Sequence, residues 1–497
     1  MSAVTPKRLS TGIDGLDDIL GGGLSADRLY LIQGEPGTGK TTLALQFLLA
    51  GVQREERCLY VTLSETEKEL REVADSHGWS LEGITLHELS AVESALQADA
   101  DNTVFNPSEV ELNETMAQVL ATAEKVKPDR VVFDSLSEMR LLAREPLRYR
   151  RQVLAVKQHF ARRRTTVLFL DDRTTDPSDL QLQSIAHGVI TLESMATEHG
   201  AARRRLRVVK MRGLKFRDGY HDYRIEQPGL VVYPRLMVPR GNLDFDTGEC
   251  LPSGNPALDA LWGGGLTRGT STVILGPAGV GKSTICTQYG HTAALRGERV
   301  CFVSFEETEG VMLSRARGMG LPLEKFVEHG TVDVHQVDPA EISPGELVHL
   351  VRHAVEQRGT RVLVIDSLNG YLNSMPEERF LVVQLHELLT YLNQHGVNAF
   401  LVVAQHGLLG SGMHTPVDVT YLADSVLMMR YFEADGRVRQ AISAMKKRSG
   451  SHERTLRECQ LTSKGLVIGE PLANFQGVLT GVPTFRGEHE VLLEAKR

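Results

Sequence analysis

The sequence contains the same ordered set of motifs twice, and this repeat limits the possible folds more than any other feature. Residues 10–24 and 253–266 both end in GGGL, and a short apolar run follows each of them. Each run then enters a glycine-rich loop and a helix-like stretch. Because the period is about 240 residues, the repeat indicates a duplicated domain rather than a solenoid of short units.

Short apolar runs that alternate with helix-like stretches predict the fold of each half. This alternation is typical of β-α-β units, so we expect two tandem α/β domains with mainly parallel sheets flanked by helices. We assign the domains to residues 1–240 and 241–497 and place the join in the segment 235–252, which contains Pro and Gly. The first half is about ten residues longer between its motifs, and we expect a surface loop within 95–112.

The composition of the 497 residues excludes several classes of protein. Hydrophobic residues make up 41% and charged residues 24%, as in ordinary globular proteins, and the net charge is −8. No apolar run reaches the roughly 20 residues of a membrane span, and the N-terminus lacks a secretory pattern. The scattered cysteines and histidines show no zinc-ligand spacing. We therefore expect a cytoplasmic protein without a membrane partner, and its acidity argues against nucleic acid as a partner.

Both glycine-rich loops fit the pattern G-x-x-x-x-G-K-[ST], which binds nucleotide phosphates. The backbone of such a loop wraps the phosphates so closely that a Cβ would collide. Lys40 and Lys282 would neutralise phosphate charge, and Thr41 and Ser283 would bind Mg²⁺. The sequence therefore predicts two sites for ATP and Mg²⁺. The loop residues expected to contact ATP are Gly34, Gly37, Thr38, Gly39, Lys40, Thr41 and Thr42, together with Gly276, Ala278, Gly279, Val280, Gly281, Lys282, Ser283 and Thr284.

Carboxylates follow each loop at positions where strands are expected to end. Asp134 and Asp366 each close an apolar run and precede Ser-Leu, so we expect them to support Mg²⁺. Glu306 and Glu307 also follow a strand, and they should point to opposite faces. One of them could orient an attacking nucleophile as general base while the other supports it. We expect the second half to be the better catalyst, with Glu306 as the leading base and Glu307 in support, and Glu306 is also a candidate Mg²⁺ ligand.

The first half offers a weaker set of acids for catalysis. Ser64 and Glu65 stand where the second half has two glutamates. A serine is a poor base near neutral pH, so hydrolysis in the first half depends on Glu65 or is slow. A solvated loop acid remains an alternative interpretation of Glu65.

Taken in order, these motifs resemble those of the KaiC family of double-domain RecA-like ATPases. The resemblance is carried by both glycine-rich loops, FEET at 305–308, both DSL elements, KMRG at 210–213 and the segment 474–483. It covers nearly the whole chain. It implies two RecA-like domains, a homo-oligomeric ring that is usually a hexamer, and ATP bound between neighbouring subunits in two tiers.

The resemblance also implies roles for two late basic clusters. In this family the Lys and Arg of K-x-R-G reach the nucleotide of the adjacent subunit, where a cation stabilises the transferring phosphoryl group. A solvated basic patch is the alternative. The matching residues are Lys210, Met211 and Arg212 in the first half, Lys446, Lys447 and Arg448 in the second, and Ser76 as a further nucleotide contact. Ser449 replaces the expected glycine.

The family's second domain can phosphorylate its own chain at adjacent Ser and Thr residues. The resemblance puts Thr420 and Tyr421 at those positions, and Thr415 is a nearby hydroxyl. The phenol oxygen of Tyr421 lies about 4 Å further out, so only Thr420 is a close match. A Thr and a Tyr that face the core of a sheet are the alternative.

We therefore expect an ATP-hydrolysing ring whose second domain is a Ser/Thr autokinase and which acts as a signalling or timing switch. A small protein partner on the first tier stays open. One alternative is a RecA-like DNA-dependent recombination or repair ATPase, for which the arginines at 162–164 and 203–207 could contact single strands. The other is a scaffold that binds ATP only to assemble.

Overall fold

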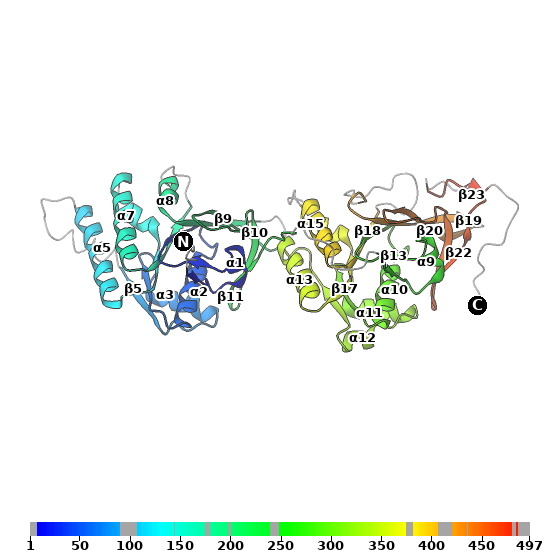
Figure 1. The fold of residues 1–497 in the computed structure, drawn as a ribbon, viewed down its shortest axis with the longest axis horizontal. Helices are drawn as coiled ribbons and strands as arrows, with labels where there is room; N and C mark the ends of the chain where they lie inside the picture. The colour runs from blue at the N-terminus through cyan, green and yellow to red at the C-terminus, as the bar shows by residue number, and fades with distance from the viewer. Residues whose placement is uncertain are drawn as a thin grey trace, which may run out of the picture. The chain divides into compact units, whose positions relative to one another are not determined.

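The computed structural model divides into two compact units, Met1–Arg235 and Leu236–Arg497. Each unit is an α/β domain with helices on both sides of a sheet (Figure 1). The described residues are 7–89, 107–143, 145–173, 179–196, 200–238, 248–373, 381–405, 420–434, 436–479 and 484–485.

The first unit is built on a nine-stranded sheet. Its strands are β3 (Leu29–Gly34), β4 (Cys58–Thr62), β5 (Ile84–Glu88), β6 (Arg130–Asp134), β7 (Thr166–Asp172), β8 (Gly188–Met195), β9 (Arg203–Met211), β10 (His221–Glu226) and β11 (Gly229–Tyr233). Their order is β11-β10-β9-β8-β3-β7-β6-β4-β5. The strands from β8 to β5 are parallel, and β9, β10 and β11 extend the sheet with antiparallel pairs. A separate short pair joins β1 (Arg8–Leu9) to β2 (Leu24–Ser25).

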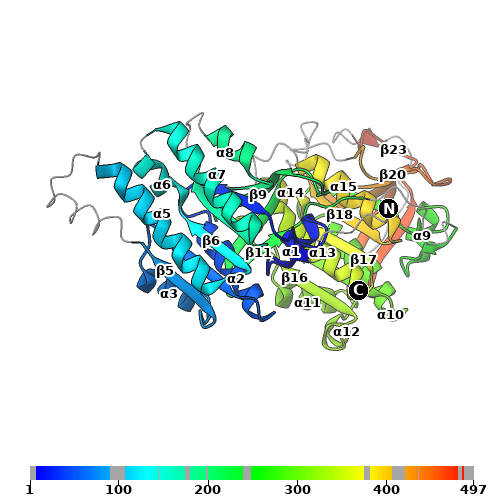
Figure 2. The ribbon, with the colours of Figure 1, turned by 60° about the vertical axis from the view of Figure 1, so that its left-hand side comes forward.

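Helices cover both faces of this sheet. The helices α1 (Asp14–Ile19), α2 (Lys40–Val52) and α3 (Glu67–Ser76) pack on one face. The helices α5 (Pro107–Val126), α6 (Leu136–Ala143), α7 (Pro146–Arg162) and α8 (Asp179–Ile185) pack on the other, and Figure 2 shows α5, α6 and α7 together on that side. The loop predicted within 95–112 is wrong in its last part, because α5 begins at Pro107.

The second unit repeats this arrangement. Its strands are β14 (Ser271–Gly276), β15 (Arg299–Ser304), β16 (Val332–Gln336), β17 (Thr360–Asp366), β18 (Asn398–Ala404), β19 (Ser425–Ala434), β20 (Arg437–Lys447), β21 (Arg457–Thr462) and β22 (Gly465–Pro471). Their order, β16-β15-β17-β18-β14-β19-β20-β21-β22, matches the first sheet strand for strand. The duplicated α/β fold predicted from the repeat is confirmed, and it is the tandem RecA-like fold that the resemblance implies.

The helices of the second unit also form two layers. The helices α9 (Pro256–Leu261), α10 (Lys282–Leu295), α11 (Glu309–Gly318) and α12 (Glu324–Glu328) pack on one face. The helices α13 (Pro344–Glu356), α14 (Leu368–Asn373) and α15 (Leu381–Gln394) pack on the other. Two short strand pairs, β12 (Cys250–Leu251) with β13 (Leu266–Thr267) and β23 (Phe475–Gln476) with β24 (Thr484–Phe485), complete the unit.

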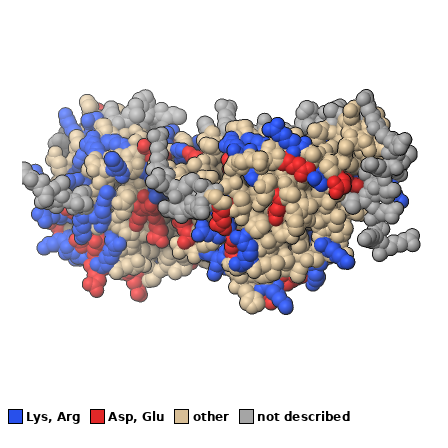
Figure 3. Space-filling view, turned by 45° about the vertical axis from the view of Figure 1, so that its right-hand side comes forward, with Lys and Arg blue, Asp and Glu red and all other residues tan. Residues whose placement is uncertain are grey.

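The surface carries mixed charge. On the face shown in Figure 3, Lys and Arg side chains are interspersed with Asp and Glu side chains. Among the described helices, none is both long and apolar enough to cross a membrane.

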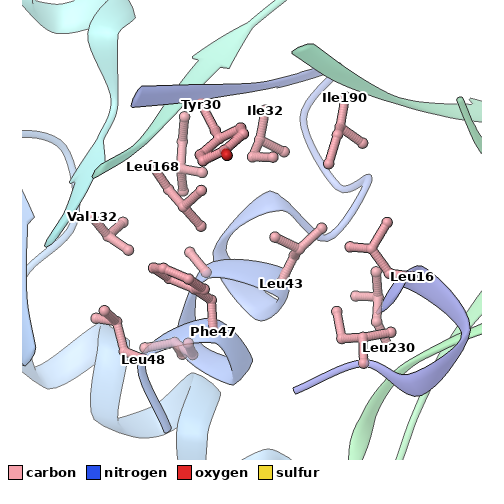
Figure 4. Close-up of a cluster of buried hydrophobic side chains, with 14 of the residues drawn as sticks. Leu16, Tyr30, Ile32, Leu43, Phe47, Leu48, Val132, Leu168, Ile190 and Leu230 are labelled. Carbon is pink, nitrogen blue, oxygen red and sulfur yellow. The ribbon is translucent and has the colours of Figure 1, made fainter. Parts of the chain in front are cut away.

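The central strands are apolar on both faces because helices cover both. In β3, Tyr30 and Ile32 pack toward α2, while Leu29 and Leu31 belong to the cluster under α5–α8. Figure 4 shows the side chains of β3 and α2 pointing toward one another. Full burial of such a side chain stabilises the fold by roughly 1.5–3 kcal/mol. This core fixes the carboxyl end of β3, from which the first glycine-rich loop emerges.

Candidate functional site

Both glycine-rich loops leave the sheet at the carboxyl end of its central strand. β3 lies between β7 and β8, and β14 lies between β18 and β19, so each loop emerges where chain connections diverge to both sides. Ligands of open α/β sheets bind at such points. The helix that follows each loop begins at Lys40 or Lys282, and its first N–H groups face the loop.

The last glycine of each loop is required by the backbone. Gly39 has a φ of 89° and Gly281 a φ of 104°, in the left-handed region that favours glycine. A Cβ on Gly39 would lie 2.7 Å from Cδ1 of Ile225. The loops thus have the backbone geometry that a phosphate cradle requires, and the residues present fit a nucleotide.

The loop lysines are buried and held by the protein. Lys40 Nζ donates to the carbonyl oxygen of Gly34 at 2.9 Å and pairs with Asp172 Oδ1 at 2.8 Å. Lys282 Nζ donates to the carbonyl oxygen of Pro277 at 2.8 Å, and burial lowers the pKa of Lys282. A phosphate would compete with these oxygens for each ammonium group.

Each loop hydroxyl contacts the aspartate predicted to support Mg²⁺. Thr41 Oγ1 donates to Asp134 Oδ2 at 3.0 Å, and Ser283 is hydrogen-bonded to Asp366. Burial raises the pKa of both aspartates. Within the described ranges, no three His, Cys, Asp or Glu side chains are grouped as a metal cage. A hydroxyl and one carboxylate fit Mg²⁺, which takes its other ligands from phosphates and water.

The two glutamates of the second unit face different partners. Ser367 Oγ donates to Glu306 Oε1 at 2.5 Å, and the charge of Glu306 acts on Lys282. Glu307 instead forms an ion pair with Arg315 of α11, with Nη2 2.9 Å from Oε2 and Nε 3.2 Å from both carboxylate oxygens. Of the two acids, Glu306 therefore lies toward the loop lysine.

Glu65 corresponds to Glu307 but has a different environment. Its backbone N–H donates to Thr62 Oγ1, as that of Glu307 does to the hydroxyl of Ser304. Val73 of α3 stands at the same offset from Glu65 as Arg315 does from Glu307. Burial and then the charge of Asp134 raise the pKa of Glu65 to about 7. Its Oε2 is buried without a hydrogen-bond partner within the described part of the chain.

Sequence reasoning did not single out three residues that touch the sites. They are Asp172, which pairs with Lys40; Arg315, which pairs with Glu307; and Tyr60, whose hydroxyl donates to Asp134 Oδ2 at 2.5 Å. Tyr60 lies inside an apolar run, where a tyrosine is typical of a core position. An alignment of the two halves would have shown that Tyr60 carries an extra hydroxyl, because the equivalent residue of the second unit is Phe302.

In each unit, the basic cluster lies level with the start of the central strand, whereas the glycine-rich loop leaves from the end of that strand. Met211 pairs with Gly188, which pairs with Tyr30 near the start of β3, whereas Gly34 at its end pairs with Leu192. In the second sheet, Lys447 pairs with Ser425, which pairs with Thr272 near the start of β14. The structure therefore does not bring these clusters to their own glycine-rich loops.

The side chains of the clusters bind backbone carbonyl groups. In the first unit, Lys210 donates to Gln183 at 2.5 Å and Arg212 donates to Ser184 at 2.8 Å. In the second unit, Lys446 donates to Thr420 and Ala423, and Arg448 donates to Tyr421. Lys447 likewise donates to backbone carbonyl groups, those of Trp262 at 2.6 Å and Gly265 at 3.0 Å.

The remaining predicted residues lie in turns and helix ends. Ser76 is the last residue of α3, and its hydroxyl donates to the carbonyl oxygen of Val73. Thr420 and Tyr421 form a turn before β19, and Tyr421 is 55% exposed. The alternative interpretation, in which Thr420 and Tyr421 face the core of a sheet, is therefore wrong. Thr415 lies outside the described residues.

The arginine runs are partly neutralised by acidic neighbours. Arg163 pairs with Glu124. Arg205 pairs with Glu193 at 3.0 Å and stacks on Tyr220. These contacts reduce the positive charge that either run would offer to a nucleic acid.

Comparison with known proteins agrees with this geometry. The family model for the KaiC ATPase matches residues 9–237 and again 251–473. The circadian clock protein KaiC3 of Synechocystis sp. is 24% identical over 492 residues, which cover 98% of this chain and 96% of that protein. The circadian clock oscillator proteins KaiC of Thermostichus vulcanus and Prochlorococcus marinus are each also 24% identical, over 97% and 96% of this chain and 93% and 95% of their own lengths. With two matched ATP-binding domains that fill most of its length, the chain belongs to the KaiC family of ATPases.

Proposed function

We propose that the protein is a Mg²⁺-dependent ATPase that works as a homo-oligomeric ring, in which each nucleotide lies between two subunits. The second domain hydrolyses ATP faster than the first, and it also phosphorylates the chain. The ring acts as a signalling or timing switch, in keeping with the clock proteins among its relatives.

The position of the basic clusters carries this proposal. From Tyr30 to Gly34 the central strand spans roughly 13 Å, at about 3.3 Å per residue. A lysine at the start of the strand cannot reach a phosphate beyond its end. Lys210 and Arg212 therefore do not serve the nucleotide of their own loop, and the same register applies to Lys446 and Arg448; this supports a nucleotide shared with another subunit.

The residues of one chain would divide the chemistry as follows. Lys282 and the loop N–H groups bind the phosphates, and Ser283 and Asp366 hold Mg²⁺, which would neutralise developing charge. Glu306 accepts the proton of the attacking water or hydroxyl. Arg448 of a neighbouring subunit stabilises charge on the transferring phosphoryl group.

A mixing experiment tests the shared site. One full-length variant carries Lys40→Ala and Lys282→Ala, and the other carries Arg212→Ala and Arg448→Ala. Each alone should lose ATP hydrolysis by at least tenfold. Random mixing should restore about a quarter of the wild-type rate, because about one interface in four pairs an intact loop with an intact arginine. A mixture as inactive as its components would contradict the shared site.

Thr420 is the proposed phosphorylation site of the second domain. It lies beside Lys446, at the edge of the sheet that would face a neighbouring subunit's nucleotide. Incubation with Mg²⁺ and γ-labelled ATP should label the protein and also release free phosphate. The label should vanish in Glu306→Gln/Glu307→Gln and in Thr420→Ala. Free phosphate without bound label would leave an ATPase that is not a kinase.

The alternatives predict different results. A DNA-dependent ATPase would be stimulated by single-stranded DNA, with an effect that fades as salt rises. A nucleotide-gated scaffold would assemble with ATP even when Glu306 and Glu307 are both replaced by Gln, and its function would survive. The ion pairs of Arg163 with Glu124 and of Arg205 with Glu193 argue against DNA or another polyanion as the partner.

A further inference from the structure

A buried tyrosine hydroxyl touches the aspartate of the first nucleotide site. The Tyr60 side chain is fully buried, and its hydroxyl donates to Asp134 Oδ2 at 2.5 Å. The same oxygen accepts from Thr41 Oγ1 at 3.0 Å. Two elements, β4 and α2, thus hold one carboxylate.

Packing alone does not require this hydroxyl. Tyr60 pairs in register with Val132, two residues before Asp134, and Phe302 pairs with Val364, two residues before Asp366. A phenylalanine therefore fills the corresponding place in the second sheet. Because a buried hydroxyl is costly unless it is hydrogen-bonded, the bond to Asp134 offsets the cost of burying the Tyr60 hydroxyl.

The two sites also differ in the carboxylates that surround the aspartate. Ser64 stands where the second site has Glu306, and Asp172, which pairs with Lys40 at 2.8 Å, has no carboxylate counterpart in the second sheet, where Ala404 pairs with Gly276. Residues that hold a metal-binding carboxylate in place affect metal affinity by about 10- to 100-fold.

We propose that Tyr60 is a positioning residue that fixes the Asp134 carboxylate for Mg²⁺ at the first nucleotide site. This inference rests on the proposed function, in which Thr41 and Asp134 hold Mg²⁺. It assigns the first site a Mg²⁺ affinity that depends on a phenol, and the second site one that does not.

The test measures Mg²⁺ affinity rather than turnover. Full-length protein carrying Lys282→Ala, which silences the second site, is titrated with Mg²⁺ while binding of a fluorescent ATP analogue is followed. Adding Tyr60→Phe should weaken the apparent Mg²⁺ affinity about tenfold. Binding of the analogue in EDTA should not change, because the glycine-rich loop is intact.

Tyr30→Phe is the matched control. It removes another buried hydroxyl of the same sheet, which donates to the carbonyl oxygen of Ser25 at 2.9 Å, far from the loop. It should leave Mg²⁺ affinity unchanged. Equal Mg²⁺ affinities for the two variants would overturn the inference, as would an equal loss of binding with and without Mg²⁺ in Tyr60→Phe.

The reverse exchange tests the inference in the second site. Phe302, Ser283 and Asp366 line one small pocket, so Phe302→Tyr would place a hydroxyl beside that aspartate. In a Lys40→Ala background, Phe302→Tyr should tighten Mg²⁺ binding severalfold. If Tyr60→Phe does not fold, this variant alone tests whether a phenol beside the aspartate affects Mg²⁺ affinity. No gain would count against the inference. If the Lys282→Ala parent bound the analogue without any Mg²⁺ dependence, the proposed Mg²⁺ site itself would be wrong.

Discussion

At the scale of single residues, we expect Glu65 to make the stability of the first domain depend on pH. Its pKa of about 7 in the folded protein exceeds the ordinary value of 4.5, so the folded state keeps a proton that the unfolded state releases. Stability should therefore fall as pH rises from about 4.5 to 7, and stay lower above that.

Replacing Glu65 by Gln should remove this pH dependence. In nucleotide-free protein at pH 8, Glu65→Gln should gain stability on the order of 1–3 kcal/mol over the wild type, and the gain should vanish near pH 4.5. Thermal unfolding at several pH values measures it. Glu82→Gln, at an exposed position, is the control. An unchanged pH slope in Glu65→Gln would assign the effect to another group.

Arg315 has a comparable effect on the second site. Burial raises the pKa of Asp366, the charge of Glu307 adds to this, and the charge of Arg315 opposes it. Arg315→Ala should therefore raise that pKa further and leave less ionised Asp366 at pH 6 than at pH 8. In a Lys40→Ala background we expect ATP hydrolysis to fall about threefold to tenfold at pH 6 and less at pH 8.

A neighbouring arginine provides the comparison for that prediction. Arg317 lies on the same helix, is largely exposed and pairs with Glu324 rather than Glu307. Arg317→Ala should leave both rates near those of the parent. A uniform loss across pH in Arg315→Ala would indicate damage to the fold of α11 instead of a charge effect.

At the scale of elements, the start of α2 depends on one glycine. A side chain at Gly39 would meet both the left-handed backbone penalty and a clash with Ile225. Gly39→Ala should abolish nucleotide binding at the first site and destabilise the domain by about 2 kcal/mol or more. Gly78→Ala carries only the backbone penalty, about 1–2 kcal/mol, because nothing lies within 4 Å of its added Cβ. Nucleotide binding with Gly78→Ala should persist, and equal effects of the two changes would contradict this account.

At the scale of the whole molecule, the proposed shared site ties activity to assembly. If an arginine from one subunit completes the site of the next, an isolated chain cannot turn over ATP efficiently. The rate per chain should therefore fall at least tenfold on dilution below the concentration at which the ring dissociates. Mass photometry and phosphate release on the same samples would measure this. A rate per chain that stays constant through dissociation would contradict it.

The duplicated α/β fold and the two glycine-rich loops could be predicted without any coordinates. Both depend on local patterns: apolar runs set the buried strands, and glycines with a following lysine set the cradle at the start of α2 and α10. Asp134 and Asp366 were predictable for the same reason, because each closes a strand in the same place of the repeat. Such features need no knowledge of which strands are neighbours.

The contacts between side chains that are distant in the sequence became known from the folded structure. The bond between Tyr60 and Asp134 exists because β4 and β6 are adjacent in register, and the pair of Glu307 and Arg315 exists because α11 folds back beside its strand end. The register of β8 and β9 sets Lys210 and Arg212 at the edge away from their own loop. Strand order and register arise from the packing of the whole sheet, and so no local pattern could supply them.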